Sequence, residues 1–512
     1  RDFYNLWAYI KAISRVDQKK HSTQNAQKPF ENKRLLCYTV RRNQRSLKLG
    51  KENIMKEIQK ATDWEKDVLY TTTVEDYPVI SYGHDVCLWD TGGKVLVDAT
   101  AQVGIAGVGQ CDSEIKNAVK QQMGKSSSLL SADFCFRNTI NFRGKEIEIS
   151  RVALAKKLID MTEPIMPGRK RKVMTEVTGA LAVNAALKLA KITHLKERGA
   201  TTEEFRKYHN QNIFLPGWTR GLFSSNFLAF KGAFHGRHGD AALLSGSKFI
   251  HRWGLSSSCG VGRLTVPYKG WEERSIRSEI DSRLDILEKY SGKVLAFVFE
   301  PILGEGGIIV PETKGMKFLI KYLREEKGIW IIADEIQTGL GRTGKMFGCE
   351  HYDIEPDVVC LSKALASGMP LSAVVADSDI FPDLEKGMHS GSFHWTPVSV
   401  ASAIVTLNII EERLPHWEET SDYFIDCVKE ICGKHKDIVT EVRGKGFMVG
   451  VEFKTAELRD KFIWKAKTEN AGAGLLLHSC GDKALRFYPR VNADYEELNT
   501  CIRLFRKTFV FM

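Results

Sequence analysis

The stretch Ile329-Trp330-Ile331-Ile332-Ala333-Asp334-Glu335-Ile336-Gln337-Thr338-Gly339 decides the fold class of this 512-residue chain. Its first five residues are apolar, a run that is typical of a strand buried on both faces. Three more such runs occur at 294–299, 358–361 and 373–376, and a helical pattern lies at 315–326. Because strand and helix signals alternate, the sequence predicts an α/β fold around a mostly parallel sheet.

Polar residues follow three of these runs where each strand is expected to end. They are Glu300, Asp334 and Lys363. The carboxyl ends of strands are where open α/β sheets bind ligands. A lysine desolvated there can form a Schiff base with an aldehyde. A buried Asp334 requires a cationic partner, which a protonated pyridine nitrogen, an arginine or a lysine would supply.

Two further segments carry binding chemistry. Thr178-Gly179-Ala180 precedes an apolar helical face, and a helix N-terminus offers N–H groups to a phosphate. The threonine alone would also be an ordinary helix cap. In Phe234-His235-Gly236-Arg237 an aromatic ring can stack on a cofactor and a guanidinium can clamp a carboxylate. A core phenylalanine and a surface arginine are the alternatives for this segment.

In this order along the chain, the segments resemble those of class III aminotransferases, enzymes of fold type I that depend on pyridoxal 5'-phosphate (PLP). The resemblance spans roughly residues 75–510 and rests on the following segments: Leu88-Trp89-Asp90, Asp98, Gly104-Ile105-Ala106, Thr178-Gly179-Ala180, Phe234 to Arg237, Glu300 to Gly307, Asp334 to Gly339, Ser362-Lys363, and Arg486-Phe487 with Pro489. It implies a mostly parallel central sheet with a smaller α+β domain formed by the N- and C-terminal segments.

The resemblance also assigns roles residue by residue. For PLP it implies these contacts: Lys363 as the catalytic Schiff-base lysine, Asp334 on the ring nitrogen, Gln337 on the ring hydroxyl, Phe234 and its neighbour His235 at the ring, Thr178, Gly179 and Ala180 at the phosphate, and Ser392 reaching the phosphate from a second subunit. For substrates it implies these contacts: Arg237 on the distal carboxylate of the donor, Arg486 on an α-carboxylate, Glu305 pairing with Arg486 when that carboxylate is absent, and Ile105 lining the site. No metal ligand is expected.

Three departures from the family pattern bear on substrate and loop shape. Ala180-Leu181-Ala182-Val183 resembles lysine 6-aminotransferases, whereas most members carry Glu at the second position. The segment 480–487 resembles animal 4-aminobutyrate aminotransferases, and a buried free thiol is expected for Cys480. His394-Trp395-Thr396 stands where most members have Gly-Gly-Asn.

The two arginines predict transfer of the amino group of an ω-amino acid, such as 4-aminobutyrate, to 2-oxoglutarate in a homodimer with shared active sites. The alternatives on the same scaffold are lysine 6-aminotransferase, ornithine or acetylornithine aminotransferase, and an amino-acid racemase. An alternative of another class is an inactive relative that binds nucleic acid or membrane through a basic N-terminus with interleaved aromatic residues. For the enzyme, neither nucleic acid nor membrane is an expected partner.

Charge and cysteine usage bear on organisation and compartment. Residues 1–60 hold 15 Lys and Arg against 5 Asp and Glu, so nearly all of the net charge of +11 lies there. A disordered basic extension is expected at 1–60, followed by 61–125 as the N-terminal part of the small domain, 126–395 as the PLP-binding domain and 396–512 as the C-terminal small domain. The 11 scattered cysteines fit a reducing compartment. A cytoplasmic location is therefore expected, or the mitochondrial matrix if 1–60 is a transit peptide.

Overall fold

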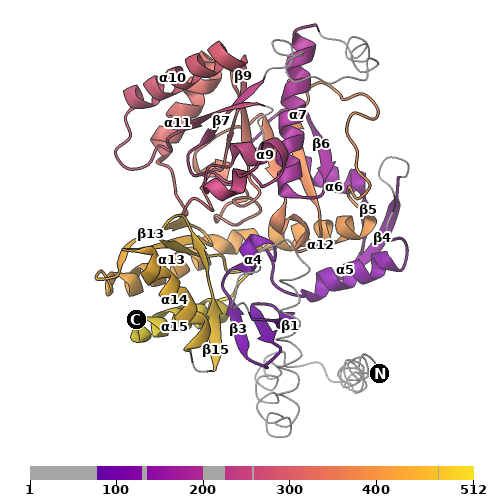
Figure 1. The fold of residues 1–512 in the computed structure, drawn as a ribbon. Coiled ribbons are helices and arrows are strands. Elements are labelled where there is room, and N and C mark those ends of the chain that lie inside the picture. The colour runs from indigo at the N-terminus through magenta and orange to yellow at the C-terminus, as the bar shows by residue number, and fades with distance from the viewer. Residues whose placement is uncertain (1–77, 128, 130–134, 200–224, 256–258, 471) are drawn as a thin grey trace. The chain divides into compact units, whose positions relative to one another are not determined.

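The chain was analysed as a computed structural model that describes residues 78–127, 129, 135–199, 225–255, 259–470 and 472–512. The described residues from Ile80 to Met512 belong to one compact unit (Figure 1). The predicted extension at 1–60 lies outside the described residues. The boundaries expected at 125 and 395 stay predictions.

A seven-stranded sheet runs through the centre of this unit. Its strands, in spatial order, are β6 (Arg171–Glu176), β12 (Ser372–Asp377), β11 (Val358–Leu361), β10 (Trp330–Asp334), β9 (Val294–Phe299), β7 (Asn226–Phe230) and β8 (Gly260–Leu264). The five strands from β11 to β8 are parallel, as predicted. The strand β12 is antiparallel to both neighbours, so the expectation that 373–376 continues the parallel set is wrong. Burial on both faces explains the apolar run, but burial does not encode strand direction.

Apolar side chains cover both faces of this sheet. In β9, Phe297 and Phe299 belong to the cluster on one face, and Ala296 and Val298 to the cluster on the other. This alternation follows from the two-residue period of a strand. Helices that contribute to these two clusters include α10 (Glu273–Ser291), α11 (Thr313–Lys321) and α12 (Pro397–Arg413) in the first, and α7 (Gly179–Glu197) and α9 (Gly239–Leu244) in the second.

Smaller sheets bring the two ends of the described chain together. The first contains β1 (Ile80–His84), β2 (Cys87–Asp90), β3 (Val95–Asp98) and β15 (Ala473–Leu476); the second β13 (Val439–Lys445), β14 (Met448–Phe453), β17 (Ala484–Phe487) and β16 (His478–Cys480); the third β4 (Arg137–Phe142) and β5 (Lys145–Ser150). The strand β3 pairs in parallel with β15. An N-terminal and a C-terminal segment therefore share one sheet.

The remaining helices are α4 (Ala101–Gly104), α5 (Ser113–Met123), α6 (Arg151–Met161), α13 (Trp417–Gly433), α14 (Ala456–Thr468) and α15 (Tyr495–Thr508), with short turns η1 (Phe249–Arg252), η2 (Tyr322–Glu326), η3 (Gly348–His351), η4 (Lys363–Ala366), η5 (Leu414–His416) and η6 (Phe509–Phe511). The helix predicted at 315–326 is formed by α11 and the wider turn η2. In the part of the chain that the structure describes, no helix has the length and apolar character needed to cross a bilayer.

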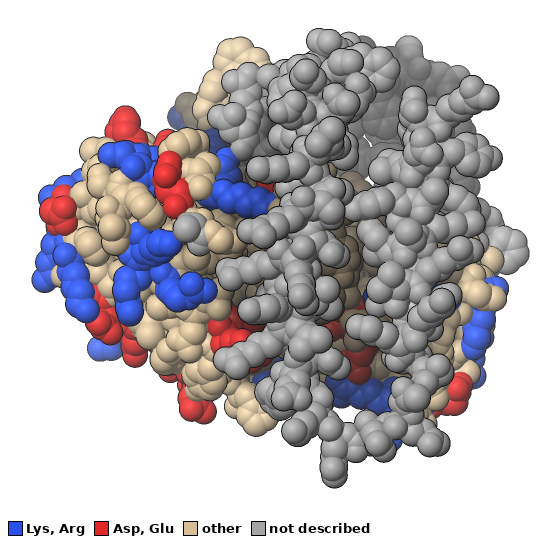
Figure 2. Space-filling model, turned by 90° about the horizontal axis from the view of Figure 1, so that it is seen from below, with Lys and Arg blue, Asp and Glu red and all other residues tan. Residues whose placement is uncertain are grey.

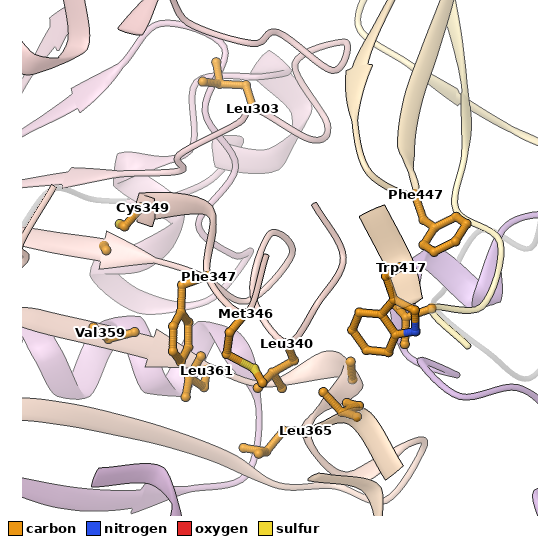
Figure 3. Packing of buried hydrophobic residues seen from close by; sticks show 14 of the residues in the cluster. Leu303, Leu340, Met346, Phe347, Cys349, Val359, Leu361, Leu365, Trp417 and Phe447 are labelled. Atoms are coloured by element: carbon orange, nitrogen blue, oxygen red, sulfur yellow. The ribbon is translucent and has the colours of Figure 1, made fainter. Parts of the chain in front are cut away.

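Packing below the carboxyl end of the sheet is dense. Leu340, Met346 and Phe347, which follow β10, lie in one buried cluster with Leu361 and Leu365, which flank Lys363 (Figure 3). Such packing fixes the turns that carry polar side chains. On the surface, the face seen in Figure 2 shows Lys and Arg interspersed with Asp and Glu over the described residues.

Candidate active site

Three ionisable side chains meet where adjacent strands of the central sheet end. Glu300 directly follows β9, Asp334 is the last residue of β10, and Lys363 opens η4 after β11. Because β9, β10 and β11 are parallel neighbours, these ends lie side by side. The geometry confirms that the three polar strand ends of the sequence form one cluster.

Lys363 is held in a strained and largely buried position. Its φ is +33°, a region that non-glycine residues rarely adopt and that is often found at functional sites. Burial, and next the guanidinium of Arg486, lower the pKa of Lys363 to about 8, while the carboxylates of Glu300 and Asp334 act in the opposite direction. About a tenth of the amine is therefore unprotonated at pH 7, roughly a hundredfold more than in an ordinary lysine with a pKa of about 10.4, and only this neutral form is nucleophilic.

The buried partner of Asp334 is a histidine. His235 Nδ1 lies 2.8 Å from Asp334 Oδ2, and the Ile336 N–H donates to Asp334 Oδ1 at 3.2 Å. The side chain of His235 is fully buried, and its Nε2 has no hydrogen-bond partner within the described ranges. The sequence allowed an arginine or lysine as a structural partner of Asp334, whereas the structure provides an imidazole that orients the carboxylate.

Glu300 received no role from the sequence, yet it organises the site. Its two carboxylate oxygens accept hydrogen bonds from the Phe234 N–H at 2.8 Å and the Gly304 N–H at 3.0 Å. Burial raises the pKa of Glu300 to about 7, and Asp334 adds to this, while His235 opposes it. Glu300 thereby ties the Phe234 segment to the loop that follows β9. The sequence marked it only by its position after an apolar strand and at the start of the family-like segment Glu300 to Gly307.

Gln337 is fixed by a tyrosine that the sequence did not single out. The hydroxyl of Tyr488 donates to Gln337 Oε1 at 2.5 Å, and Tyr488 is fully buried. A Cβ at Gly304 would lie 1.7 Å from the same Gln337 oxygen, so only glycine fits there. The amide of Gln337 is thus held from two sides, three residues beyond Asp334, the last residue of β10.

The predicted phosphate turn is a helix start, as expected. Thr178 caps α7, and its hydroxyl accepts the Leu181 N–H at 3.4 Å. The first N–H groups of a helix have no partner within it, which leaves those of Gly179 and Ala180 to an anion. A Cβ at Gly236 would lie 2.5 Å from the Ala180 Cβ. The turn and the Phe234 segment therefore pack closely.

A buried ion pair connects the two predicted substrate residues Glu305 and Arg486. Glu305 Oε2 lies 2.9 Å from Arg486 Nη2, and Lys248 Nζ donates to Glu305 Oε1 at 2.7 Å. Burial raises the pKa of Glu305, but Arg486 and Lys248 outweigh it, so the net effect is a lowered pKa. Among the residues that the structure describes, the Nε and Nη1 atoms of the buried Arg486 have no hydrogen-bond partner. The sequence gave no signal for Lys248, because it reads as a surface lysine.

The remaining predicted residues lie around this cluster. Arg237 is exposed, with its guanidinium carbon 5.8 Å from the centroid of the Phe234 ring. Ile105 is 42 % exposed and follows α4, which is a left-handed turn. A Cβ at Gly104 would lie 4.0 Å from Lys363 Cδ, which places this turn beside the lysine. Ser392 is exposed on the single chain, and its predicted contact would come from a second copy.

Two further features of the chain concern the thiol of Cys480 and the grouping of side chains that could bind a metal ion. Cys480 is buried and free, as expected. Throughout the ranges that the structure describes, no group of three or more His, Cys, Asp and Glu side chains could hold a metal ion.

The residues present fit PLP. A buried amine of lowered pKa suits the aldehyde, a buried carboxylate suits a pyridinium nitrogen, and a helix N-terminus suits a phosphate. The fold and site together define a PLP-dependent transferase of fold type I. The model of the family Aminotransferase class-III matches residues 71–509, so the chain belongs to the class III aminotransferases. It is therefore a PLP-dependent enzyme that transfers an amino group between an amino donor and a keto acid.

Solved structures agree with this fold. An ornithine δ-aminotransferase from Plasmodium falciparum is 25 % identical, with a TM-score of 0.63 over 88 % of this chain and 98 % of that one. An ornithine aminotransferase from Toxoplasma gondii ME49 is 24 % identical, with a TM-score of 0.68 over 88 % and 95 %. An acetylornithine aminotransferase from Elizabethkingia anophelis is 23 % identical, with a TM-score of 0.63 over 89 % and 99 %.

Proposed function

We propose that this enzyme moves the amino group of an ω-amino acid of the 4-aminobutyrate type to 2-oxoglutarate, as a homodimer with shared active sites. The observation that carries the proposal is the buried Glu305–Arg486 pair beside Lys363. Glu305 occupies Nη2, the nitrogen common to both bidentate faces of the Arg486 guanidinium, so a substrate carboxylate can bind Arg486 bidentately once Glu305 moves away. Glu305 neutralises that arginine when no carboxylate is present.

This arrangement lets one site accept two differently charged substrates. An ω-amino donor has no carboxylate next to the reacting amine, so the Glu305–Arg486 pair stays closed while it reacts. The α-carboxylate of 2-oxoglutarate would take the place of Glu305 on Arg486. Lys248, already hydrogen-bonded to Glu305, remains as a partner for the displaced carboxylate. A buried carboxylate left without a partner would oppose the exchange.

The chain's own residues account for the chemistry at the reacting carbon. Bound PLP supplies the electrophilic aldehyde and the electron-accepting ring. Lys363 offers its amine to the aldehyde and afterwards accepts and returns a proton as a general acid–base. Asp334, oriented by His235, would keep a ring nitrogen protonated. Gln337, held by Tyr488, would orient the ring hydroxyl. The first N–H groups of α7 would bind the phosphate.

The far end of the site favours a donor with one distal carboxylate. Arg237 lies over the Phe234 ring, and no carboxylate among the described residues forms an ion pair with it. His251 lies in the field of both Arg237 and Lys248, and burial followed by Arg237 lowers the pKa of its imidazole. An α-ammonium, as in ornithine or lysine, would meet these cations, whereas 4-aminobutyrate brings only its carboxylate.

Ornithine is the second candidate donor, because the 25 % identical structure from Plasmodium falciparum is an ornithine δ-aminotransferase. Its δ-amine is also an ω-amine, so the Glu305–Arg486 pair would serve it equally. Its α-amino group requires an acceptor near Arg237, which Glu305 would have to provide while it already binds Lys248 and Arg486. Because the positive charge around Arg237 disfavours the α-ammonium of ornithine, we place ornithine second to 4-aminobutyrate as the donor.

A panel of half-reactions tests the proposal. Enzyme loaded with PLP would be mixed with 4-aminobutyrate, L-ornithine, N-acetyl-L-ornithine or L-lysine, and the visible absorbance of the bound cofactor followed. We expect 4-aminobutyrate to remove the absorbance fastest, and 2-oxoglutarate, but not pyruvate, to restore it. Faster loss with ornithine or lysine would overturn the donor, and restoration by pyruvate would overturn the acceptor. Light scattering tests the dimer.

A further inference from the structure

The loop that carries Ser392 is anchored by two residues that replace the family's glycines. It joins β12 to α12 and contains His394 and Trp395. Trp395 has a φ of +49° and is fully buried. A bulky residue in the left-handed region persists only when surrounding contacts hold it there. Trp395 therefore keeps the backbone conformation that glycine would adopt freely, and its indole side chain in addition anchors the loop.

Trp395 reaches the strand that supports the phosphate turn. Its Nε1 donates to the carbonyl oxygen of Ser372 at 2.8 Å, and the hydroxyl of Ser372 donates to the carbonyl oxygen of Thr178 at 2.9 Å. Thr178 caps α7. The loop is thus fixed to the residues that shape the phosphate turn of its own chain.

His394 makes the second anchor, on β6. Its Nε2 lies 3.1 Å from Oε2 of Glu176, and its Nδ1 lies 3.4 Å from the hydroxyl of Thr175. Both side chains of the His394–Glu176 pair are at least nine-tenths buried. A Cβ at Gly391 would lie 2.2 Å from His394 Nε2, so the loop folds tightly over the imidazole.

Burial and proximity define this pair. Glu176 Oε2 is buried and accepts no directed hydrogen bond in the described parts of the chain, and His394 Nε2 lies 3.1 Å from it. His389 Nε2 lies farther away, 3.6 Å from Oε1, and it donates to the Thr175 carbonyl at 3.1 Å. A buried carboxylate requires a polar partner, and of the two imidazoles that of His394 is the nearer.

These anchors leave the tip of the loop free for another molecule. Ser392 is exposed, and the next residue, Phe393, is 71 % exposed. The loop therefore buries the side chains of His394 and Trp395 inside its own chain and presents Ser392 on the surface. If Ser392 serves a neighbouring subunit, its position there is decided by contacts made in its own subunit.

We infer that His394, paired with Glu176 and assisted by Trp395, is a positioning residue that holds Ser392 for the cofactor phosphate in a second copy of this chain. The inference rests on the proposed homodimer. It assigns the effect of His394 to the active site of the partner and not to the site of its own chain.

The test uses mixed dimers in which only one subunit retains Lys363. In the first, one subunit carries H394Q together with K363A and its partner is unchanged. In the second, H394Q lies on the subunit that keeps Lys363, and K363A on the other. Borohydride reduction at graded PLP concentrations traps the pyridoxyl group on Lys363, and mass spectrometry measures the occupied fraction. The same titration with pyridoxal, which lacks the phosphate, isolates the phosphate contribution.

We expect the first dimer to need about tenfold more PLP for half occupancy, in line with the loss of one hydrogen bond to a charged group. The second dimer should match the unchanged enzyme, and pyridoxal occupancy should be the same in all. Loss in the second dimer only, loss in both, or loss in neither would overturn the inference. A merely structural role would weaken PLP and pyridoxal alike.

Two further variants guard against misfolding and bystander effects. E176Q keeps the shape of the anchor but removes its charge, and it should reproduce the result of H394Q when placed on the same subunit. His84, the exposed last residue of β1, forms a 2.9 Å contact with the neighbouring Asp85, so H84Q is a matched control that should change nothing. A monomeric mass in light scattering would contradict the proposed dimer. A dimer in which H394Q has no effect on the partner's active site would contradict only the inference about His394.

Discussion

Arg486 and Glu305 form a buried ion pair, with Nη2 of the arginine 2.9 Å from Oε2 of the glutamate. The pair joins β17, from the C-terminal part of the chain, to the loop after β9 of the central sheet. The Glu305 carbonyl also accepts the Gly481 N–H at 2.7 Å, which fixes this loop against the turn before β17. An α-carboxylate can therefore replace Glu305 on Arg486 by a movement of the Glu305 side chain alone, while the backbone stays in place.

Substitution R486Q should separate the two half-reactions. Loss of a charge-assisted carboxylate contact corresponds to about 1.5–3 kcal/mol, or roughly ten- to a hundredfold. We expect the KM for 2-oxoglutarate to rise by that factor, while the half-reaction with 4-aminobutyrate changes far less. Stopped-flow absorbance of each half-reaction measures both. Equal losses in the two half-reactions would contradict the separate assignment of Arg486.

The lowered pKa of Lys363 predicts how capture of PLP depends on pH. Because the pKa of Lys363 is about 8, the amine is mostly protonated at a pH below this value and then cannot attack an aldehyde. At a pH above it, the neutral form predominates. The rate at which cofactor-free enzyme captures PLP should therefore rise with pH and level off above about 8. A free lysine would still be gaining near 10. A midpoint near the ordinary lysine value would refute the role of burial.

Two variants should move this midpoint in opposite directions. Arg486 lowers the pKa of Lys363, so R486Q should shift the midpoint of the capture rate to higher pH. Glu300 raises the pKa of Lys363, so E300Q should shift the midpoint to lower pH. Measurement of the pH–rate profile for the three proteins under identical ionic strength checks the signs. Shifts in the same direction would contradict the sign assigned to one of the two charges, and no shift in either variant would contradict both.

The sequence predicted the chemistry at the strand ends better than the geometry around it. Asp334 and Lys363 were predictable because an apolar strand that ends in charge is a local signal. The partner of Asp334, His235, lies 99 positions away in the chain, and such pairing depends on the fold. Tyr488 was missed because a buried aromatic residue is ordinary core unless its hydroxyl contact is known.

Backbone shape was also outside the reach of the sequence. The left-handed φ of Trp395 could not be predicted, because a bulky residue seldom adopts it and only tertiary contacts explain it. The direction of β12 was mispredicted for a related reason. Its apolar residues are the same whichever way the strand runs, and the connection to β11 decides the pairing.

A methyl group at Gly304 should damage the site without altering its charge. The Cβ of G304A would meet Gln337 Oε1 at 1.7 Å, so the amide must leave its place and lose the Tyr488 hydroxyl. We expect weaker PLP binding and a shifted absorbance maximum of the bound cofactor. Gly433 is the matched control, because nothing lies within 4 Å of an added Cβ there. G433A should leave both properties unchanged, and an equally unaffected G304A would show that Gln337 does not contact the cofactor.

Arg237 offers the sharpest test of the donor's distal carboxylate, because it is exposed and its substitution leaves the buried core unchanged. Its side chain lies over the Phe234 ring and forms no ion pair with a carboxylate in the described ranges. R237Q should therefore fold normally, with an unchanged melting temperature. We expect the KM for 4-aminobutyrate to rise roughly tenfold, as for loss of a charged hydrogen bond, while the KM for 2-oxoglutarate rises less. If n-butylamine, which lacks the carboxylate, lost as much efficiency as 4-aminobutyrate, the arginine would act on the site as a whole and not on the carboxylate.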